Sequence, residues 1–489
     1  MIVSLAALTS HAIAAPTPAG LADLVTSLPG LPASYTSKIY SGFIPLDAAA
    51  TKKMFYWHVE SQSPTAATDP LVLWTNGGPG CSGLVGFMTE QGPFRPTADG
   101  NLTLNPHAWN FAANMVFIEQ PVGVGFSIAP AGQVYGDAEA AADNHAFLVN
   151  FIALKFPDYS TRPLYITSES YGGHYMPTLA AEIVRQNVLT NFKGFAVGNP
   201  LTSMPFRDEG EISTFANHQL IPNPLFGKYL SSGCPGQWNS TVPSPACVEV
   251  QSRIENLTSG LDPYALDFPV CGGPLASSRG DRRALLNALA RAKGRGEHEG
   301  GPAPSTYFPE NYTPCDMDWT TQYLNRADVQ AAIHVTPAQG SEMAQQRGAG
   351  PVAWASCSNA VGNGFSAGDV NAPMMPVYSY LLNQETMPKL NMLVYSGDDD
   401  SVCSTPGTQQ WLWGPTLNLS VTDEWSPWTM DSFAGIPAQI SGYHVLFNGD
   451  AAGANGLHFA TVHGAGHMVP ATRPSQALEL FKRFLGGTW

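Results

Sequence analysis

Short apolar runs that alternate with amphipathic segments constrain the fold of this 489-residue chain more than any other feature. The apolar runs lie at 70–75, 114–118 and 163–167, and segments with apolar residues at helical spacing lie at 137–156 and 173–185. The runs predict buried strands and the segments predict helices, the first of them capped by Asp137. Strands that alternate with helices form a mostly parallel sheet covered on both faces. The sequence therefore predicts an α/β fold.

The alternation breaks in the middle of the chain. After an apolar run at 192–197, the residues from about 203 to 325 are rich in Pro, Gly, Cys and N-glycosylation sequons and lack clear strands. The pattern resumes with a helical stretch at 326–334, strands at 391–395 and 457–462, and an amphipathic helix at 474–485. We therefore expect a core built from residues 16–202 and 326–489, interrupted by a cap insertion at 203–325.

The N-terminal residues 1–15 have the pattern of a secretory signal peptide, with an apolar run and a small-x-small site at 12–14, although no Lys or Arg precedes the run. The alternative is a frayed apolar N terminus. We expect a secreted glycoprotein, with delivery to a vacuole or lysosome as the alternative. Its sequons are Asn101, Asn239, Asn256, Asn311 and Asn418.

The net charge of −15 argues against nucleic acid or an anionic membrane as a partner, because 38 acidic residues outnumber 23 basic ones. No stretch after the N terminus reaches the roughly 18 uninterrupted apolar residues of a membrane-spanning helix. The seven cysteines form no C-x-x-C pair and show no zinc-site spacing. In an oxidising compartment they allow up to three disulfides and one free thiol, and their spacing does not give the pairing.

A candidate nucleophile lies where the strand at 163–167 gives way to the following helix. The segment 168–172, SESYG, approximates the G-x-S-x-G elbow that lifts a serine hydroxyl above a sheet, and it places Ser170 at the nucleophile position. Ser168 stands where glycine is usual, and a positive φ there would cost serine more than glycine. Alone, the motif favours an ordinary serine in a glycine-rich turn over a nucleophile.

Acidic and histidine residues follow two later strands. The segment 395–400, YSGDDD, and the segment 463–470, HGAGHMVP, would emerge at the same sheet edge as Ser170, in the Ser, Asp, His order of α/β-hydrolases. The acidic run could also be a solvated loop. His463 and His467 have the spacing of a helical zinc pair, but the intervening glycines and Pro470 disfavour a helix. We therefore expect no metal and no cofactor.

Four glycine-rich segments carry a family resemblance: 74–82 (WTNGGPGCS), 119–127 (EQPVGVGFS), 168–173 (SESYGG) and 464–470 (GAGHMVP). Together with YSGFI at 40–44 and FYWHVE at 55–60, they resemble the serine carboxypeptidases, the family of carboxypeptidase Y, cathepsin A and the wheat enzymes. The resemblance extends over nearly the whole mature chain. It implies an α/β-hydrolase fold with an inserted cap.

The resemblance assigns roles to the residues at these positions. It makes Ser170 the nucleophile, His467 its base, and Asp400, not Asp398, the acid that orients the histidine. The backbone amides of Gly78 and Tyr171 would form the oxyanion hole. Residues that bind the free C-terminal carboxylate of a substrate would be Trp74, Asn76, Gly77, Glu90 and Glu169. A carboxyl group binds a carboxylate only when it holds a proton, so we expect Glu90 and Glu169 to share one and activity to be acidic.

The resemblance also implies disulfides and a substrate pocket. The implied pairs are Cys81–Cys357, Cys234–Cys247 and Cys271–Cys315, which leave Cys403 free. Met468 and Cys403 would contribute to the pocket, and Met468 suggests an apolar preference for the leaving residue. A basic segment near 277–304 would be either an excised linker or an intact variable loop.

The function that follows is a serine carboxypeptidase acting on peptide or protein C termini, as a monomer or a homodimer. Two alternatives remain. Some family members are acyltransferases that use the same triad, and cathepsin A also stabilises partner proteins.

Overall fold

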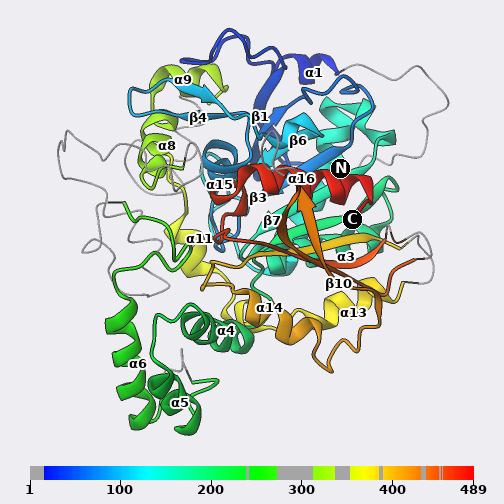
Figure 1. Cartoon of the computed structure of the whole chain (residues 1–489). Coiled ribbons are helices and arrows are strands. Elements are labelled where there is room, and N and C mark those ends of the chain that lie inside the picture. The colour runs from blue at the N-terminus through cyan, green and yellow to red at the C-terminus, as the bar shows by residue number, and fades with distance from the viewer. Residues whose placement is uncertain are drawn as a thin grey trace.

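The computed structural model describes residues 16–237, 242–271, 312–335, 353–384, 389–430, 437–450, 453 and 455–489. A ten-stranded sheet in the order β1-β2-β6-β3-β7-β8-β9-β12-β11-β10 runs through the molecule (Figure 1). Its strands are β1 (Ile39–Pro45), β2 (Lys53–Val59), β3 (Leu71–Thr75), β6 (Asn114–Ile118), β7 (Leu164–Glu169), β8 (Phe192–Gly198), β9 (Asn391–Gly397), β10 (Val421–Met430), β11 (Gln439–Phe447) and β12 (Gly456–Val462).

The strands from β6 to β12 in this order pair in parallel, and the two strands at each edge pair antiparallel. The predicted α/β class with a mostly parallel sheet is therefore confirmed. The sequence did not predict β10, because its residues are almost all exposed and lack a buried apolar run.

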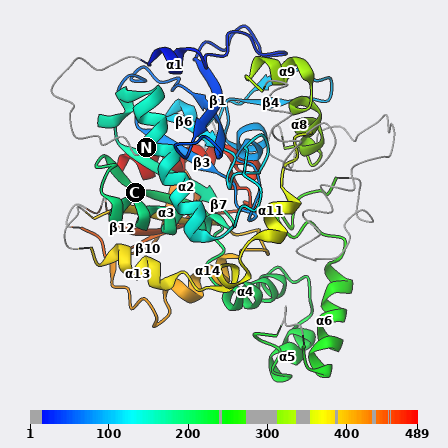
Figure 2. The same ribbon diagram turned by 180° about the vertical axis from the view of Figure 1, so that it is seen from behind.

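Both faces of the sheet carry a hydrophobic core, because successive strand residues point to opposite faces. Along β3, Leu71 and Leu73 pack into one core and Val72 and Trp74 into the other. The first core is covered by α2 (Asp137–Asn150), α3 (Gly172–Gln186), α13 (Met375–Leu382) and α14 (Thr405–Leu412). The second is covered by α16 (Pro474–Gly486), whose Phe481 and Phe484 are buried, and Figure 2 shows the helical layer of the first core.

The prediction that Asp137 caps α2 is wrong. Gly136 occupies the cap position and Asp137 is the first helical residue. The Asp137 carboxylate instead accepts hydrogen bonds from His174 Nδ1 at 2.9 Å and from the Tyr171 hydroxyl at 3.1 Å. This acid therefore binds α2 to the first turns of α3.

The segment between β8 and β9 contributes α4 (Met204–Asn217), α5 (Asn223–Ser231), α6 (Pro245–Thr258) and α8 (Asp316–Leu324). Apolar side chains from α4 to α6 form a small core of their own, and α5 and α6 lie away from the sheet in both views (Figures 1 and 2). The boundaries 203 and 325 of a separate cap remain a prediction. The segments 1–15 and 277–304 lie outside the described residues.

The remaining elements are short. They are α1 (Pro18–Leu21), α9 (Ala327–Ala332), α11 (Asn359–Gly364), α12 (Ala367–Asn371), α15 (Val469–Thr472), the β4 (Phe94–Pro96) and β5 (Leu102–Leu104) pair, π-turns at Gly86–Glu90 and Phe151–Lys155, and 3₁₀ turns at Trp109–Phe111 and Pro157–Thr161. Within the described ranges, no helix is both long and apolar enough to cross a membrane.

Three disulfides join Cys81 to Cys357, Cys234 to Cys247, and Cys271 to Cys315, the pairing that the resemblance implies. Cys403 is a free, buried thiol. The sequons Asn101, Asn256 and Asn418 are exposed, and Asn239 and Asn311 lie outside the described residues. Exposure makes the first three accessible acceptors for a glycan.

Candidate active site

The turn between β7 and α3 places Ser170 at the carboxyl end of a central strand. Ser170 has a φ of 60°, so the left-handed conformation belongs to the serine at the apex. Ser168 has no positive φ and lies within β7, so serine in place of glycine at this position bears no such cost. The Ser170 N–H donates to Gly198 O at 3.0 Å, and the Leu201 N–H donates to Ser170 O at 2.8 Å. These bonds hold the turn in one conformation.

Gly172 is the glycine that this turn requires. A Cβ atom at position 172 would lie 2.1 Å from Ser168 Oγ and 2.4 Å from Ser168 Cβ. We therefore expect Gly172→Ala to lower the free energy of unfolding by about 2–3 kcal/mol, because either α3 or β7 must move. Chemical denaturation measures this loss.

The matched control is Gly227→Ala in α5, where an added Cβ meets no atom within 4 Å. Alanine is a better helix former than glycine, so this variant should unfold at equal or higher denaturant concentration. Equal stability of the Gly172→Ala and wild-type proteins would contradict the crowding at the turn.

His467 and Asp400 come from the loops that follow β12 and β9. The His467 Nδ1–H donates to Asp400 Oδ2 at 2.6 Å, and the two side chains are 4% and 0% exposed. Asp398, two residues earlier, pairs instead with His463, whose side chain is 75% exposed. The buried pair is therefore Asp400 with His467, and His463 and His467 do not share a partner.

Asp400 accepts hydrogen bonds from three groups besides His467. The side-chain amide of Asn199 donates to Asp400 Oδ2 at 2.9 Å, the Cys403 N–H donates to the same oxygen at 3.1 Å, and the Val402 N–H donates to Oδ1 at 2.8 Å. These three hydrogen bonds fix the orientation of the carboxylate. Asn199 was not among the residues expected from the sequence, although its place directly after β8 puts it at the same sheet edge.

Tyr264, in the irregular segment after α6, also contacts His467. Its backbone carbonyl oxygen accepts a hydrogen bond from the backbone N–H of His467 at 2.7 Å, and its ring lies edge-on to the imidazole with centroids 5.0 Å apart. No pattern in the irregular segment around Tyr264 indicated this contact.

Backbone amides gather beside Ser170 because the loop after β3 approaches the turn closely. A Cβ atom at Gly77 would lie 2.4 Å from the Tyr171 nitrogen, so only glycine allows this approach. Gly78, the next residue, is exposed and has a φ of 115°. The amides expected to form an oxyanion hole, those of Gly78 and Tyr171, therefore belong to two backbone segments in contact.

A buried polar cluster lies under the turn. The Asn76 side-chain amide donates to Glu90 Oε1 at 3.1 Å and to Glu169 Oε1 at 2.8 Å. Its own oxygen accepts the Trp74 Nε1–H and the Gly86 N–H, each at 2.9 Å. The structure thus brings the predicted carboxylate-binding residues together around one asparagine whose orientation is fixed.

The two glutamates interact with each other. Burial raises the pKa of Glu90, and burial together with the charge of Glu90 raises the pKa of Glu169 well above its usual range. The Oε2 atom of each carboxyl is buried and finds no N–H or O–H donor among the described residues. Two buried carboxyl groups with raised pKa values, each with an oxygen that lacks a donor, favour a state in which the pair holds one proton.

Cys403 and Met468 lie next to the Asp400 and His467 positions. Burial raises the pKa of the Cys403 thiol well above its usual range, so the thiol is neutral and not a nucleophile. Met468 is half-buried. Their contribution to a substrate pocket remains a prediction.

Comparisons with known proteins agree with this architecture. The serine carboxypeptidase family model matches residues 29–487. Among Arabidopsis thaliana proteins, serine carboxypeptidase-like 46 is 35% identical over 481 residues and serine carboxypeptidase 24 is 34% identical over 480, each match covering 95% of this chain and 92% of the relative.

The fold is similar to that of Kex1Δp, a prohormone-processing carboxypeptidase from Saccharomyces cerevisiae, with a TM-score of 0.70, 21% identity and 96% of both chains covered. At this identity the likeness shows the fold, and the family follows from the sequence matches. The chain belongs to the serine carboxypeptidase family.

Proposed function

We propose that this protein is a serine-type carboxypeptidase that releases the C-terminal residue of peptides and proteins at acidic pH. The observation that carries the proposal is the buried pair Glu90 and Glu169, joined through Asn76 directly beside Ser170. A hydrolase without preference for a free C terminus has no use for two desolvated carboxyls next to its nucleophile. Such a pair is costly to bury, and binding a carboxylate explains it.

In the proposed reaction, Ser170 Oγ attacks the last peptide carbonyl while His467 Nε2 takes the hydroxyl proton. The Asp400 carboxylate, held by four hydrogen bonds, stabilises the imidazolium that forms. The amides of Gly78 and Tyr171 bind the developing oxyanion. His467 then protonates the leaving amine, and water hydrolyses the acyl-enzyme on Ser170 by the same steps in reverse order.

Recognition of the substrate carboxylate depends on the shared proton. With one proton between them, Glu90 and Glu169 present an O–H donor to the substrate carboxylate, and the Asn76 amide donates one hydrogen to each glutamate and so orients both. As the pH rises through the raised pKa of the pair, the proton is lost and two negative carboxylates face a third. Peptide binding should therefore weaken toward alkaline pH, whereas substrates without a free carboxylate should be less affected.

The variant Glu169→Gln tests the shared proton. Glutamine is neutral at every pH and keeps an N–H donor, so the fall of kcat/KM between about pH 5 and about pH 8 should shrink by about tenfold or more. The readout is kcat/KM for a blocked dipeptide with a free C terminus, compared with its C-terminal amide over the same pH range. The loss should appear mainly in KM for the dipeptide.

The control for this variant is Glu139→Gln, an exposed position near the start of α2. Its profile should match that of the wild type. If the wild-type pH profile of kcat/KM had the same shape for the dipeptide and the amide, Glu90 and Glu169 would have no role in binding the substrate carboxylate.

The same substrates separate the proposal from its alternatives. Release of the last residue from the dipeptide indicates a carboxypeptidase. Transfer from an activated acyl ester without dipeptide hydrolysis indicates an acyltransferase, and inertness toward both indicates a stabilising partner protein. We further propose that residues 1–15 direct secretion, with vacuolar or lysosomal delivery as the alternative.

A further inference from the structure

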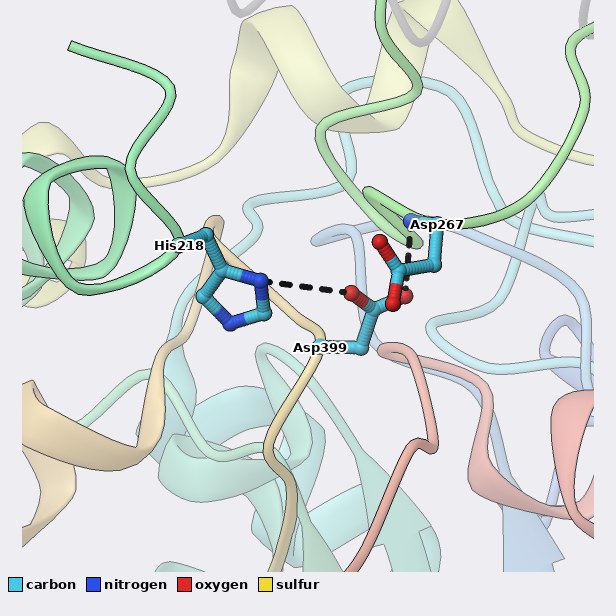
Figure 3. A group of neighbouring side chains, drawn as sticks. All are labelled: His218, Asp267 and Asp399. Atoms are coloured by element: carbon cyan, nitrogen blue, oxygen red, sulfur yellow. Dashed lines mark hydrogen bonds and ion pairs between the residues drawn. The ribbon is translucent and has the colours of Figure 1, made fainter.

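A second cluster of titratable groups lies one residue from Asp400 and has no part in the proposed reaction. It joins His218 at the end of α4, Asp267 in the segment 262–268, and Asp399 in the loop after β9 (Figure 3). One ligand-type atom from each residue lies within 4.8 Å of the others. The burial of these residues ranges from the exposed Asp267 through the half-buried His218 to the buried Asp399.

Asp399 supplies the first observation that points to a ligand. Its residue is 1% exposed, and its Oδ2 accepts the Asp267 N–H at 3.1 Å. Its Oδ1 is buried and has no hydrogen-bond partner within the described ranges. A buried carboxylate oxygen without a donor is unfavourable, so this atom needs a proton or, above the value of about 7 to which burial raises the pKa of Asp399, a positively charged partner. His218 Nδ1 lies 3.8 Å away, beyond hydrogen-bond distance.

The other ring nitrogen of His218 supplies the second observation. Nε2 lies 3.2 Å from the backbone oxygen of Asp398, and because a carbonyl oxygen can only accept, Nε2 carries a proton. In the neutral ring the lone pair is then on Nδ1, which is the atom that faces Asp399 Oδ1. A histidine that donates one N–H to a carbonyl and presents the other nitrogen is the usual arrangement of a metal ligand.

We propose that His218, Asp267 and Asp399 bind a divalent transition-metal ion of the Zn²⁺ type. One imidazole and two carboxylates suit such ions, whereas Ca²⁺ and Mg²⁺ prefer oxygen ligands alone. Ligand bonds of about 2.1 Å place two ligands of one ion roughly 3–4 Å apart, which agrees with the 3.8 Å between His218 Nδ1 and Asp399 Oδ1. The exposed side of Asp267 leaves a fourth position open to solvent.

A bound ion would join the end of α4, the segment 262–268 and the loop after β9, which lie beside the Asp400–His467 pair. Leu266 N already donates to Asp399 O at 3.2 Å, and Ser401 N donates to Pro263 O at 3.0 Å. The same segment 262–268 contains Tyr264, whose backbone carbonyl accepts a hydrogen bond from the backbone N–H of His467. The ion therefore acts on stability and on the positioning of this segment, not on the chemical step.

The test is a zinc titration of the untagged full chain, stripped with a chelator, at about pH 8, above the value of about 7 to which burial raises the pKa of Asp399. We expect one saturable site per chain in competition with a chromophoric chelator, and a rise in Tm with zinc. His218→Gln and Asp267→Asn should each weaken zinc binding by about 10- to 100-fold and abolish the rise in Tm. Mg²⁺ at the same concentration should not compete.

The matched control is Asp423→Asn, an exposed carboxylate on β10, which should bind zinc like the wild type. His218 and Asp267 are not buried, and the Tm of each metal-free variant shows whether it has folded. Absence of a saturable site would mean that His218 and Asp399 form only an ion pair, which overturns the proposal. Unchanged affinity in both variants, or an equal loss in Asp423→Asn, would overturn it as well.

Discussion

Ser170→Ala should lower kcat for a blocked dipeptide by about 10⁴-fold or more, because it removes the only atom that can form the acyl-enzyme. The residual rate would come from substrate binding and the oxyanion amides alone. Stability should change little, since Ser and Ala bear a similar cost at a φ of 60°. Single-turnover kinetics with an activated ester measures the loss at the acylation step.

The matched control is Ser168→Ala, two residues earlier and within β7. Ser168 is fully buried and its Oγ makes one long hydrogen bond, to Glu169 O at 3.4 Å. Its loss should leave kcat within a few-fold of the wild type. An organophosphonate probe should label the wild type and Ser168→Ala once each and leave Ser170→Ala unlabelled. Labelling of Ser170→Ala with retained turnover would assign the nucleophile elsewhere.

Asp400→Asn should lower kcat by about 10³- to 10⁴-fold, because a neutral amide does not stabilise the imidazolium form of His467. The structure predicts a second cost. Both carboxylate oxygens accept N–H groups, so wherever the new NH₂ group lies it faces a donor, either that of Val402 or those of Asn199 and Cys403. We expect a loss of about 1–3 kcal/mol in the free energy of unfolding.

The loop itself offers the control for this substitution. Asp398 also bonds a histidine, at 2.7 Å between Asp398 Oδ2 and His463 Nδ1, but the His463 side chain is 75% exposed and that of Asp398 is 35% exposed. Asp398→Asn should keep kcat within a few-fold of the wild type. Asp398 Oδ1 also accepts the Gly464 N–H at 2.6 Å, so this variant should lose some stability, but less than Asp400→Asn because water reaches the groups left unpaired. Equal losses in the two variants would show that the loop, and not the charge next to His467, limits the rate.

The sequence predicted the features that depend on residues close to one another along the chain. Short apolar runs predicted the central strands and helical spacing predicted α2, α3 and α16, and the position of Ser170 after β7 followed from the strand that precedes it. The exposed strand β10 has no such pattern. The family resemblance supplied the set around Asn76 and the disulfide pairs, which spacing did not give.

Contacts between distant segments could not be read from the sequence. Tyr264 meets His467, and Asn199 meets Asp400, because the chain returns to the same sheet edge after about 200 residues, as the separation of 201 in the second pair shows. The cluster of His218, Asp267 and Asp399 is of the same kind. Such partners depend on how loops pack, and a single sequence contains no periodic signal for packing between loops.

The strand order divides the protein into two halves along the pairing of β8 with β9. Strands β1, β2, β3, β6, β7 and β8 lie on one side of that pairing and β9 to β12 on the other, and the long segment between β8 and β9 connects the two halves. The first half carries Ser170 and the second carries Asp400 and His467, and the Asn199–Asp400 hydrogen bond spans the boundary. Two separately expressed fragments would each hold an incomplete triad, and turnover would report their reassembly into one sheet.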